Sequence, residues 1–113
     1  MKIVYIAHPI SGNVSGNLSA IKEIVRGINL RMPEVLPFAH YVIDCESLND
    51  TIPEERERGI KNDIVLLKAG FINELWLYGS RVSEGMKHEI ALAKELGIPV
   101  ISMSIGTMDY GTE

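Results

Sequence analysis

The chain has 113 residues, of which 46% are hydrophobic and 23% are charged, and its formal net charge is −4. This composition is ordinary for a globular protein, and the length suits one core, so we predict a single domain over residues 1–113. The acidic balance argues against a protein that binds DNA or RNA polymers, because such proteins present a basic surface. It leaves small nucleotide ligands open, since a few backbone amides can hold one phosphate.

Two function classes have no support in the sequence. The single cysteine, Cys45, and the three histidines lack metal-ligand spacing, so we predict no metal. The apolar N-terminal run IVYIAHPI is too short to cross a membrane and lacks the layout of a secretory signal. We therefore predict a cytoplasmic protein that has no membrane partner.

The N-terminal half predicts two strands around one helix. Residues 2–7 form a β-branched apolar run of the kind found in central strands of parallel sheets. After a loop rich in Gly, Ser and Asn, apolar residues recur at spacings of three and four and predict a helix: Leu18, Ile21, Val25 and Ile28. Residues 34–43 predict a second strand, which Pro37 places near a sheet edge or a strand end. Residues 44–50 read as a polar connection.

The C-terminal half predicts two helices and two strands. Pro53 suits the first turn of a helix, and its buried stripe is expected to contain Ile60, Ile64 and Leu67. Residues 73–79 predict a third strand, residues 82–96 a helix capped by Ser83, and residues 98–104 a final strand. Residues 104–113 lack clear periodicity and are expected to form a tail or an oligomer contact.

This alternation of strands and helices predicts an α/β fold. We expect a three-layer sandwich in which a mostly parallel sheet of four to five strands has helices on both faces, as in flavodoxin-like and Rossmann-like proteins. Ligands bind to such sheets beyond the carboxyl ends of the strands. Residues 8–12 and 78–85, which follow the first and third strands, are therefore expected to line the working edge.

One charged residue, Glu89, falls on the apolar face of the helix predicted over residues 82–96. At roughly 100° per residue, Glu89 shares that face with Met86, Ile90 and Ala93, and the other charged residues lie opposite. An unpaired buried carboxylate is costly, so we expect Glu89 to be paired, protonated or beside a cavity.

Two interpretations of Glu89 stay open at this point. It is either a structural glutamate held by a core hydroxyl, from Tyr5 or Tyr78, or a functional carboxylate that faces the crevice past Gly85. The loop over residues 11–17 likewise has two interpretations, a phosphate cradle at a helix start or a simple turn. His8 lies beside that loop, where a binding role is expected.

Four short motifs, in order over residues 1–103, resemble the nucleoside 2-deoxyribosyltransferase-like superfamily, and most of all its small phage and bacterial members of unassigned function. They are YIAHPISG, the helix opened by Asn17, ELWLYG, and SEGMKHEIALAKELGIPV. Tyr5, Ala7 and Pro9 match a Y-x-A-x-P pattern. Gly85 and Glu89 match a glycine followed four residues later by a nucleophilic glutamate.

The resemblance implies that Glu89 attacks the anomeric carbon of a deoxyribosyl group and that Tyr5 orients its carboxylate. It implies a small-molecule nucleoside or nucleotide as the ligand, and no cofactor. It also implies a homo-oligomer in which residues 102–110 complete a neighbour's pocket. The substrate-binding residues that it implies are His8, Pro9, Ser11, Gly12, Gly79, Ser83, Gly85 and Met86.

One departure from the superfamily leaves two functions open. The acidic residue that usually precedes the glycine is absent from GSRVSEG, and Asp44, Asp50 and Asp63 are candidates for the acid that protonates the leaving base. The first function is cleavage or transfer of the N-glycosidic bond of a deoxynucleoside or its 5′-monophosphate. The second is a module that binds a nucleotide or a nucleotide signal without turnover. The absent acid favours binding, whereas the set Tyr5, Gly85 and Glu89 favours catalysis.

Overall fold

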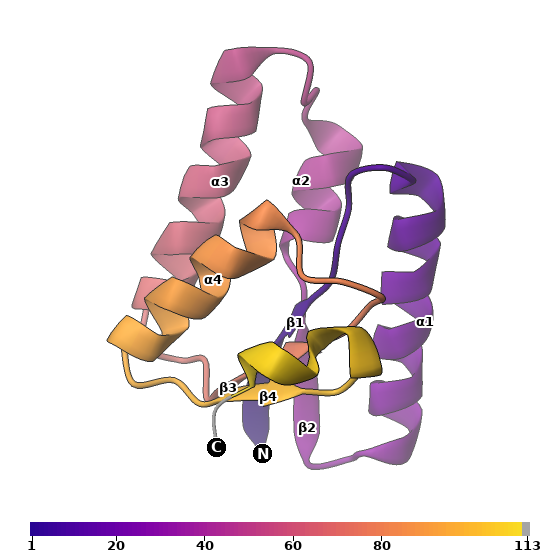
Figure 1. Cartoon of the computed structure of the whole chain (residues 1–113), viewed down its shortest axis with the longest axis vertical. Coiled ribbons are helices and arrows are strands. Elements are labelled where there is room, and N and C mark those ends of the chain that lie inside the picture. Colours follow the sequence, from indigo (N-terminus) through magenta and orange to yellow (C-terminus); the bar gives the residue numbers. More distant parts are fainter. Residues whose placement is uncertain (112–113) are drawn as a thin grey trace.

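The computed structural model describes residues 1–111, in which strands and helices alternate around one sheet (Figure 1). The strands are β1 (Lys2–Ala7), β2 (Val35–Phe38), β3 (Glu74–Leu77) and β4 (Val100–Ser102). The helices are α1 (Val14–Arg31), α2 (Tyr41–Ser47), α3 (Pro53–Lys68), α4 (Glu84–Glu95) and the short 3-10 helix η1 (Ile105–Tyr110). All strand pairs are parallel, in the order β2-β1-β3-β4, which confirms the predicted α/β fold with four strands.

The core has two parts because successive residues of a strand face opposite sides of the sheet. Val4 and Ile6 of β1 pack with Trp76 and with Ile28 of α1 on one face. On the other face, Tyr5 and Ala7 join side chains of α3 and α4: Leu67, Met86, Ile90 and Ala93. Figure 1 accordingly shows α1 on one side of the sheet and α3 with α4 on the other, as expected for three layers.

The strand predicted over residues 34–43 is correct only in its first half. β2 ends at Phe38, and α2 begins at Tyr41, so residues 44–47 are helical and the predicted polar connection is wrong there. Val42 and Ile43 are β-branched and favour a strand locally. Tertiary contacts override that preference, because the buried Tyr41 anchors the helix by donating its hydroxyl to the Ile6 carbonyl. As a result α2 lies beyond the carboxyl ends of β1 and β2 (Figure 1).

The predicted buried stripe of α3 is wrong in two of its three residues. Ile60 and Ile64 are 51% and 40% exposed, whereas Leu67 is 1% exposed. The inward-facing residues are spaced by four and run through Gly59, Asp63 and Leu67. The N-terminal part of α3 extends past the sheet and packs against α2, so that only its last turns reach the main core (Figure 1). This rotation turns Asp63 inward.

The C-terminal segment is more ordered than the prediction of a tail. β4 ends at Ser102, and residues 105–110 form η1, in which Thr107 is 0% exposed. The predicted oligomer contact remains a prediction, and residues 112 and 113 lie outside the described part of the chain. Within residues 1–111, none of the helices combines the length and the apolar character that a membrane span requires.

Candidate active site

The half-buried Glu89 and the buried Tyr5 form a pair between α4 and β1. Glu89 occupies the core-facing side of α4 beside Met86, Ile90 and Ala93, as predicted from the helix periodicity. The Tyr5 side chain is fully buried, and its hydroxyl donates a hydrogen bond to Glu89 Oε2. From the sequence, Tyr5 and Tyr78 are both candidate hydroxyl partners of Glu89, and Tyr5 makes that hydrogen bond.

The surroundings of this pair disfavour negative charge. Burial raises the pKa of the Glu89 carboxyl to about 8; the hydrogen bond from Tyr5 lowers the pKa, and the nearby Asp63 raises it. Burial, and then the charge of Glu89, also raises the pKa of Tyr5 well above its usual value. Tyr5 consequently stays protonated and acts as a donor to the carboxylate form of Glu89.

Asp63 of α3 is a second carboxyl at this site. Burial raises its pKa to about 7, and the charge of Asp44 raises it further. Among the described residues, Asp63 Oδ1 is buried and has no hydrogen-bond partner. Asp44 does have partners, since it accepts from Asn62 Nδ2 at 3.4 Å and lies 3.7 Å from His40 Nε2. Buried polar atoms are nearly always satisfied in folded proteins, so the free oxygen of Asp63 is an exception that sets this carboxyl apart.

Of the three aspartates considered from the sequence, Asp63 is the one with a buried oxygen that lacks a partner among the described residues. Asp50 is exposed, and Asp44 is engaged with its neighbours. The sequence missed the position of Asp63 because Ile60 and Ile64 suggested a different inward face of α3. The signal that would have found it is the spacing of four from Gly59 through Asp63 to Leu67.

Tyr41 completes the lining around Tyr5 and was not recognised from the sequence. Its ring centroid lies 5.9 Å from that of Tyr5, and its hydroxyl holds the start of α2 to β1. Cys45 follows one turn later, and burial together with the nearby Asp50 raises the pKa of its thiol to about 11. The thiol therefore stays protonated at neutral pH and is a poor nucleophile.

A polar cavity of about 340 Å³ lies between the loops that follow β1 and β3. The predicted residues His8, Pro9, Ser11 and Gly12 all line it. Arg81, which sequence reasoning did not select, also lines it, and its Nη2 donates to the Ser11 carbonyl at 3.0 Å. This hydrogen bond ties the two loops together and leaves the cavity with one cationic side chain.

Four other predicted residues lie close to these loops but do not line the cavity. Gly79 has φ +109°, and a Cβ there would lie 2.6 Å from Pro9 Cδ, so only glycine fits between the loops. Ser83 caps α4 as predicted, with its Oγ accepting from the Met86 amide at 3.3 Å. The Met86 side chain is buried in the core. A Cβ on Gly85 would meet nothing within 4 Å, so the space one turn from Glu89 is open.

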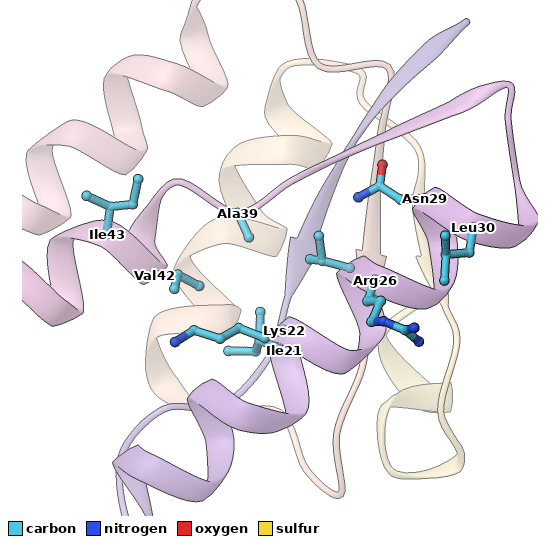
Figure 2. Close-up of a pocket in the computed structure, with 9 residues that line it drawn as sticks. Ile21, Lys22, Arg26, Asn29, Leu30, Ala39, Val42 and Ile43 are labelled. Carbon is cyan, nitrogen blue, oxygen red and sulfur yellow. The ribbon is translucent and has the colours of Figure 1, made fainter.

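A larger groove of about 500 Å³ lies elsewhere, between α1 and α2, and contains none of the predicted site residues. Its lining is mainly aliphatic, and Figure 2 shows Ile21 and Lys22 on α1 opposite Val42 of α2. Lys22 pairs with Glu46 at 2.7 Å. Size alone therefore does not identify the site, because none of Glu89, Tyr5 and Asp63 lines this groove.

Within residues 1–111 there is no cluster of three His, Cys, Asp or Glu side chains that could hold a metal ion. The fold brings two carboxyls and two tyrosines close to one another, and a separate polar cavity lies between the loops that follow β1 and β3. A pair of carboxyl groups can do nucleophilic and acid–base work at a glycosidic centre, where a raised pKa suits the acid and the nucleophile must be ionised.

Comparison with known proteins places the fold and the family. The structure is similar to that of a 2-deoxyribosyltransferase from the psychrotolerant bacterium Bacillus psychrosaccharolyticus, with a TM-score of 0.62 and 19% sequence identity, over 90% of this chain and 72% of that chain. This likeness supports a distant fold relationship, in agreement with the observed parallel sheet. No curated protein matches the chain. Because residues 2–103 match the family described as Domain of unknown function (DUF7768), the chain belongs to that family.

Proposed function

We propose that the protein cleaves or transfers the N-glycosidic bond of a deoxynucleoside or its 5′-monophosphate, with Glu89 as the nucleophile. The observation that carries the proposal is the position of Glu89 on the apolar face of α4, where the buried Tyr5 donates to its carboxylate. The fold likeness to a 2-deoxyribosyltransferase supports the same reaction class.

In the first step, a Glu89 carboxylate oxygen forms a bond to C1′ of the sugar while the bond from C1′ to the base nitrogen breaks. The electron pair of the broken bond goes to the base, and the product is a glycosyl ester on Glu89. Tyr5 engages Oε2, which orients the carboxyl and leaves Oε1 for the attack. The open space beside Gly85 gives the sugar room to approach.

Asp63 is our candidate for the acid that protonates the leaving base. Its raised pKa of about 7 keeps a useful fraction of the carboxyl protonated near neutral pH, and its Oδ1 has no competing partner in the described chain. In the second step, Asp63 takes a proton from water, the water oxygen attacks C1′, and the Glu89 carboxylate leaves. A second base in place of water gives transfer instead of hydrolysis.

The two carboxyls titrate as a pair. Their pKa values of about 8 and about 7 lie close together, and the charge of Asp63 contributes to the raised pKa of Glu89, so the two titrations overlap. The reaction requires Glu89 ionised and Asp63 protonated, which is the less populated of the two singly protonated forms because Glu89 has the higher pKa. The rate should therefore fall below about pH 7, where both groups are neutral, and above about pH 8, where both are charged.

A nucleotide-binding module without turnover is the second candidate. One observation favours it: a pKa of about 8 leaves much of Glu89 neutral at physiological pH, and a neutral carboxyl is not a nucleophile. Under this alternative, the cavity beside Arg81 holds the ligand and the buried carboxyls have only a structural role.

The experiment is to incubate the purified protein with deoxynucleosides and their 5′-monophosphates and to measure free base by chromatography. We expect the wild type to release base, Glu89→Gln to release none, and Asp63→Asn to lose about 100-fold to 10,000-fold in rate. Glu95→Gln, an exposed change on the same helix, is the control. Equal release by wild type and Glu89→Gln would remove Glu89 from the mechanism, and ligand binding without release would favour the binding module.

A further inference from the structure

The 3-10 helix η1 packs backbone to backbone against the loop that follows β3. A Cβ on Gly106 of η1 would lie 2.1 Å from the Ser80 carbonyl oxygen, so the two backbones approach as closely as glycine permits. Ser104 Oγ accepts a hydrogen bond from the Gly79 amide at 3.1 Å. On the β3 side, the contact is therefore made by Gly79 and Ser80, and Ser80 itself lines the cavity.

A cluster of hydroxyls fixes η1 in this position. The fully buried Thr107 Oγ1 lies 2.8 Å from the Ser104 carbonyl oxygen, 3.3 Å from the Leu77 carbonyl oxygen and 2.7 Å from Ser102 Oγ. The Met103 amide donates to the same Leu77 carbonyl at 2.8 Å. Thr107 thus connects η1 to the last residue of β3.

The contacts continue from β3 into the candidate site. Gly79 and Ser80 are followed by Arg81, which lines the cavity and holds the Ser11 carbonyl of the opposite loop. Ser83 then caps α4, the helix that carries Glu89. One short loop therefore links η1 to the cavity, to its cationic residue and to the nucleophile-bearing helix.

We propose that η1 is a positioning element of its own subunit's active site: it holds the loop 79–83 in place so that Ser80 and Arg81 face the bound nucleoside or nucleotide. The inference rests on the proposed function for the identity of the ligand. It assigns to residues 104–107 a role within one chain, in addition to any contact with a neighbouring subunit. Thr107 acts through the loop and is a positioning residue, not a catalytic one.

Two substitutions at Thr107 test this proposal. Thr107→Val keeps the shape but removes the hydroxyl, whereas Thr107→Ser keeps the hydroxyl. Loss of one to two hydrogen bonds should raise hydrogen exchange in the segment 79–83 of Thr107→Val by about five- to tenfold. It should raise KM by a similar factor and leave kcat within about twofold, since Glu89 and Asp63 are not contacted. Thr107→Ser should restore both values.

Ser104→Ala gives a milder test in case Thr107→Val unfolds, because it removes only the acceptor of the Gly79 amide. Asp109→Asn, an exposed change on η1, should alter nothing. The proposal would be overturned if both Thr107→Val and Ser104→Ala kept the hydrogen exchange and the KM of the wild type. It would also be overturned if kcat and stability fell together in Thr107→Val and Thr107→Ser did not restore them.

The hydrogen-exchange measurement needs no substrate, so a failure of the inference about η1 can be told apart from a failure of the proposed function. If the wild type releases no base, the reaction is refuted, and calorimetry with deoxynucleoside 5′-monophosphates replaces KM. Weaker binding by Thr107→Val would then uphold the positioning role. If none of these ligands binds to the wild type, the inference fails even where exchange rises, since there is no ligand for the loop to face.

Discussion

Glu89 combines an unfavourable position for stability with a favourable one for chemistry. Its carboxyl has lost most of its contact with water, which raises its pKa from 4.5 to about 8, and the hydrogen bond from Tyr5 offsets only part of this effect. Between these two pH values, the folded chain holds a proton that the unfolded chain releases. Ionisation of Glu89 therefore lowers the free energy of unfolding as the pH rises from about 4.5 to about 8.

The decrease in the free energy of unfolding with rising pH leads to a prediction for Glu89→Gln, because the glutamine side chain is neutral at every pH. The variant should match the wild type within about 1 kcal/mol at pH 5 and exceed its stability by a few kcal/mol at pH 9. Urea unfolding at the two pH values measures the difference. Glu95→Gln should show the pH dependence of the wild type. An unchanged difference between wild type and Glu89→Gln across this range would mean that Glu89 is not desolvated.

The two carboxyls differ in how readily the sequence reveals them. Glu89 is visible because it interrupts an otherwise apolar helix face, a contrast that periodicity detects. Asp63 is hidden because Ile60 and Ile64 make another face of α3 look buried. Only the packing of α3 against α2 shows which face is turned inward, and that contact links segments that local patterns treat separately.

At the scale of elements, the site depends on the close approach of the loops after β1 and β3. Gly79 and Gly70 both have positive φ, +109° and +88°, but a Cβ at Gly70 would meet nothing within 4 Å. Gly70→Ala should therefore show the backbone strain alone, about 1–3 kcal/mol. Gly79→Ala should cost clearly more, because it also pushes Pro9 away, and it should impair ligand binding.

Thermal or urea unfolding of the two alanine variants, with ligand affinity measured beside it, tests this comparison. Equal destabilisation by the two substitutions, with affinity unchanged in Gly79→Ala, would contradict a tight contact between the loops. Gly70→Ala serves as the matched control because it changes the same backbone conformation away from the site.

Elements whose apolar residues follow a clear period could be predicted from the sequence, and those fixed by polar contacts could not. The predicted bounds of β1 and α4 lie close to the observed ones, and the apolar stripe of Leu18, Ile21, Val25 and Ile28 predicts α1 without fixing its ends. The sequence predicts a strand for the first three residues of α2 because Val42 and Ile43 are β-branched, and a polar connection for the rest. The buried Tyr41 and its bond to the Ile6 carbonyl impose a helix instead. The sequence predicts a tail or an oligomer contact in place of η1, because the anchor of η1 is the hydroxyl of Thr107, which leaves no hydrophobic pattern.

For the whole molecule, the strand order explains why these residues meet. β1 and β3 are the two central strands, so Tyr5, the loop after β1 and the loop after β3 are neighbours at one edge of the sheet. The fold is similar to that of a 2-deoxyribosyltransferase at 19% identity, and a fold of this kind supports many activities. The activity must therefore be argued from Glu89, Tyr5 and Asp63.

The most direct measurement of the central claim is detection of the covalent intermediate. The protein would be mixed with a deoxynucleotide or deoxynucleoside that releases base, quenched in acid at short times, digested and analysed by mass spectrometry. We predict that the peptide containing Glu89 gains the mass of the sugar residue and that Glu89→Gln gains none. Base release without any adduct, or an adduct on Asp63 in place of Glu89, would contradict the proposed role of Glu89.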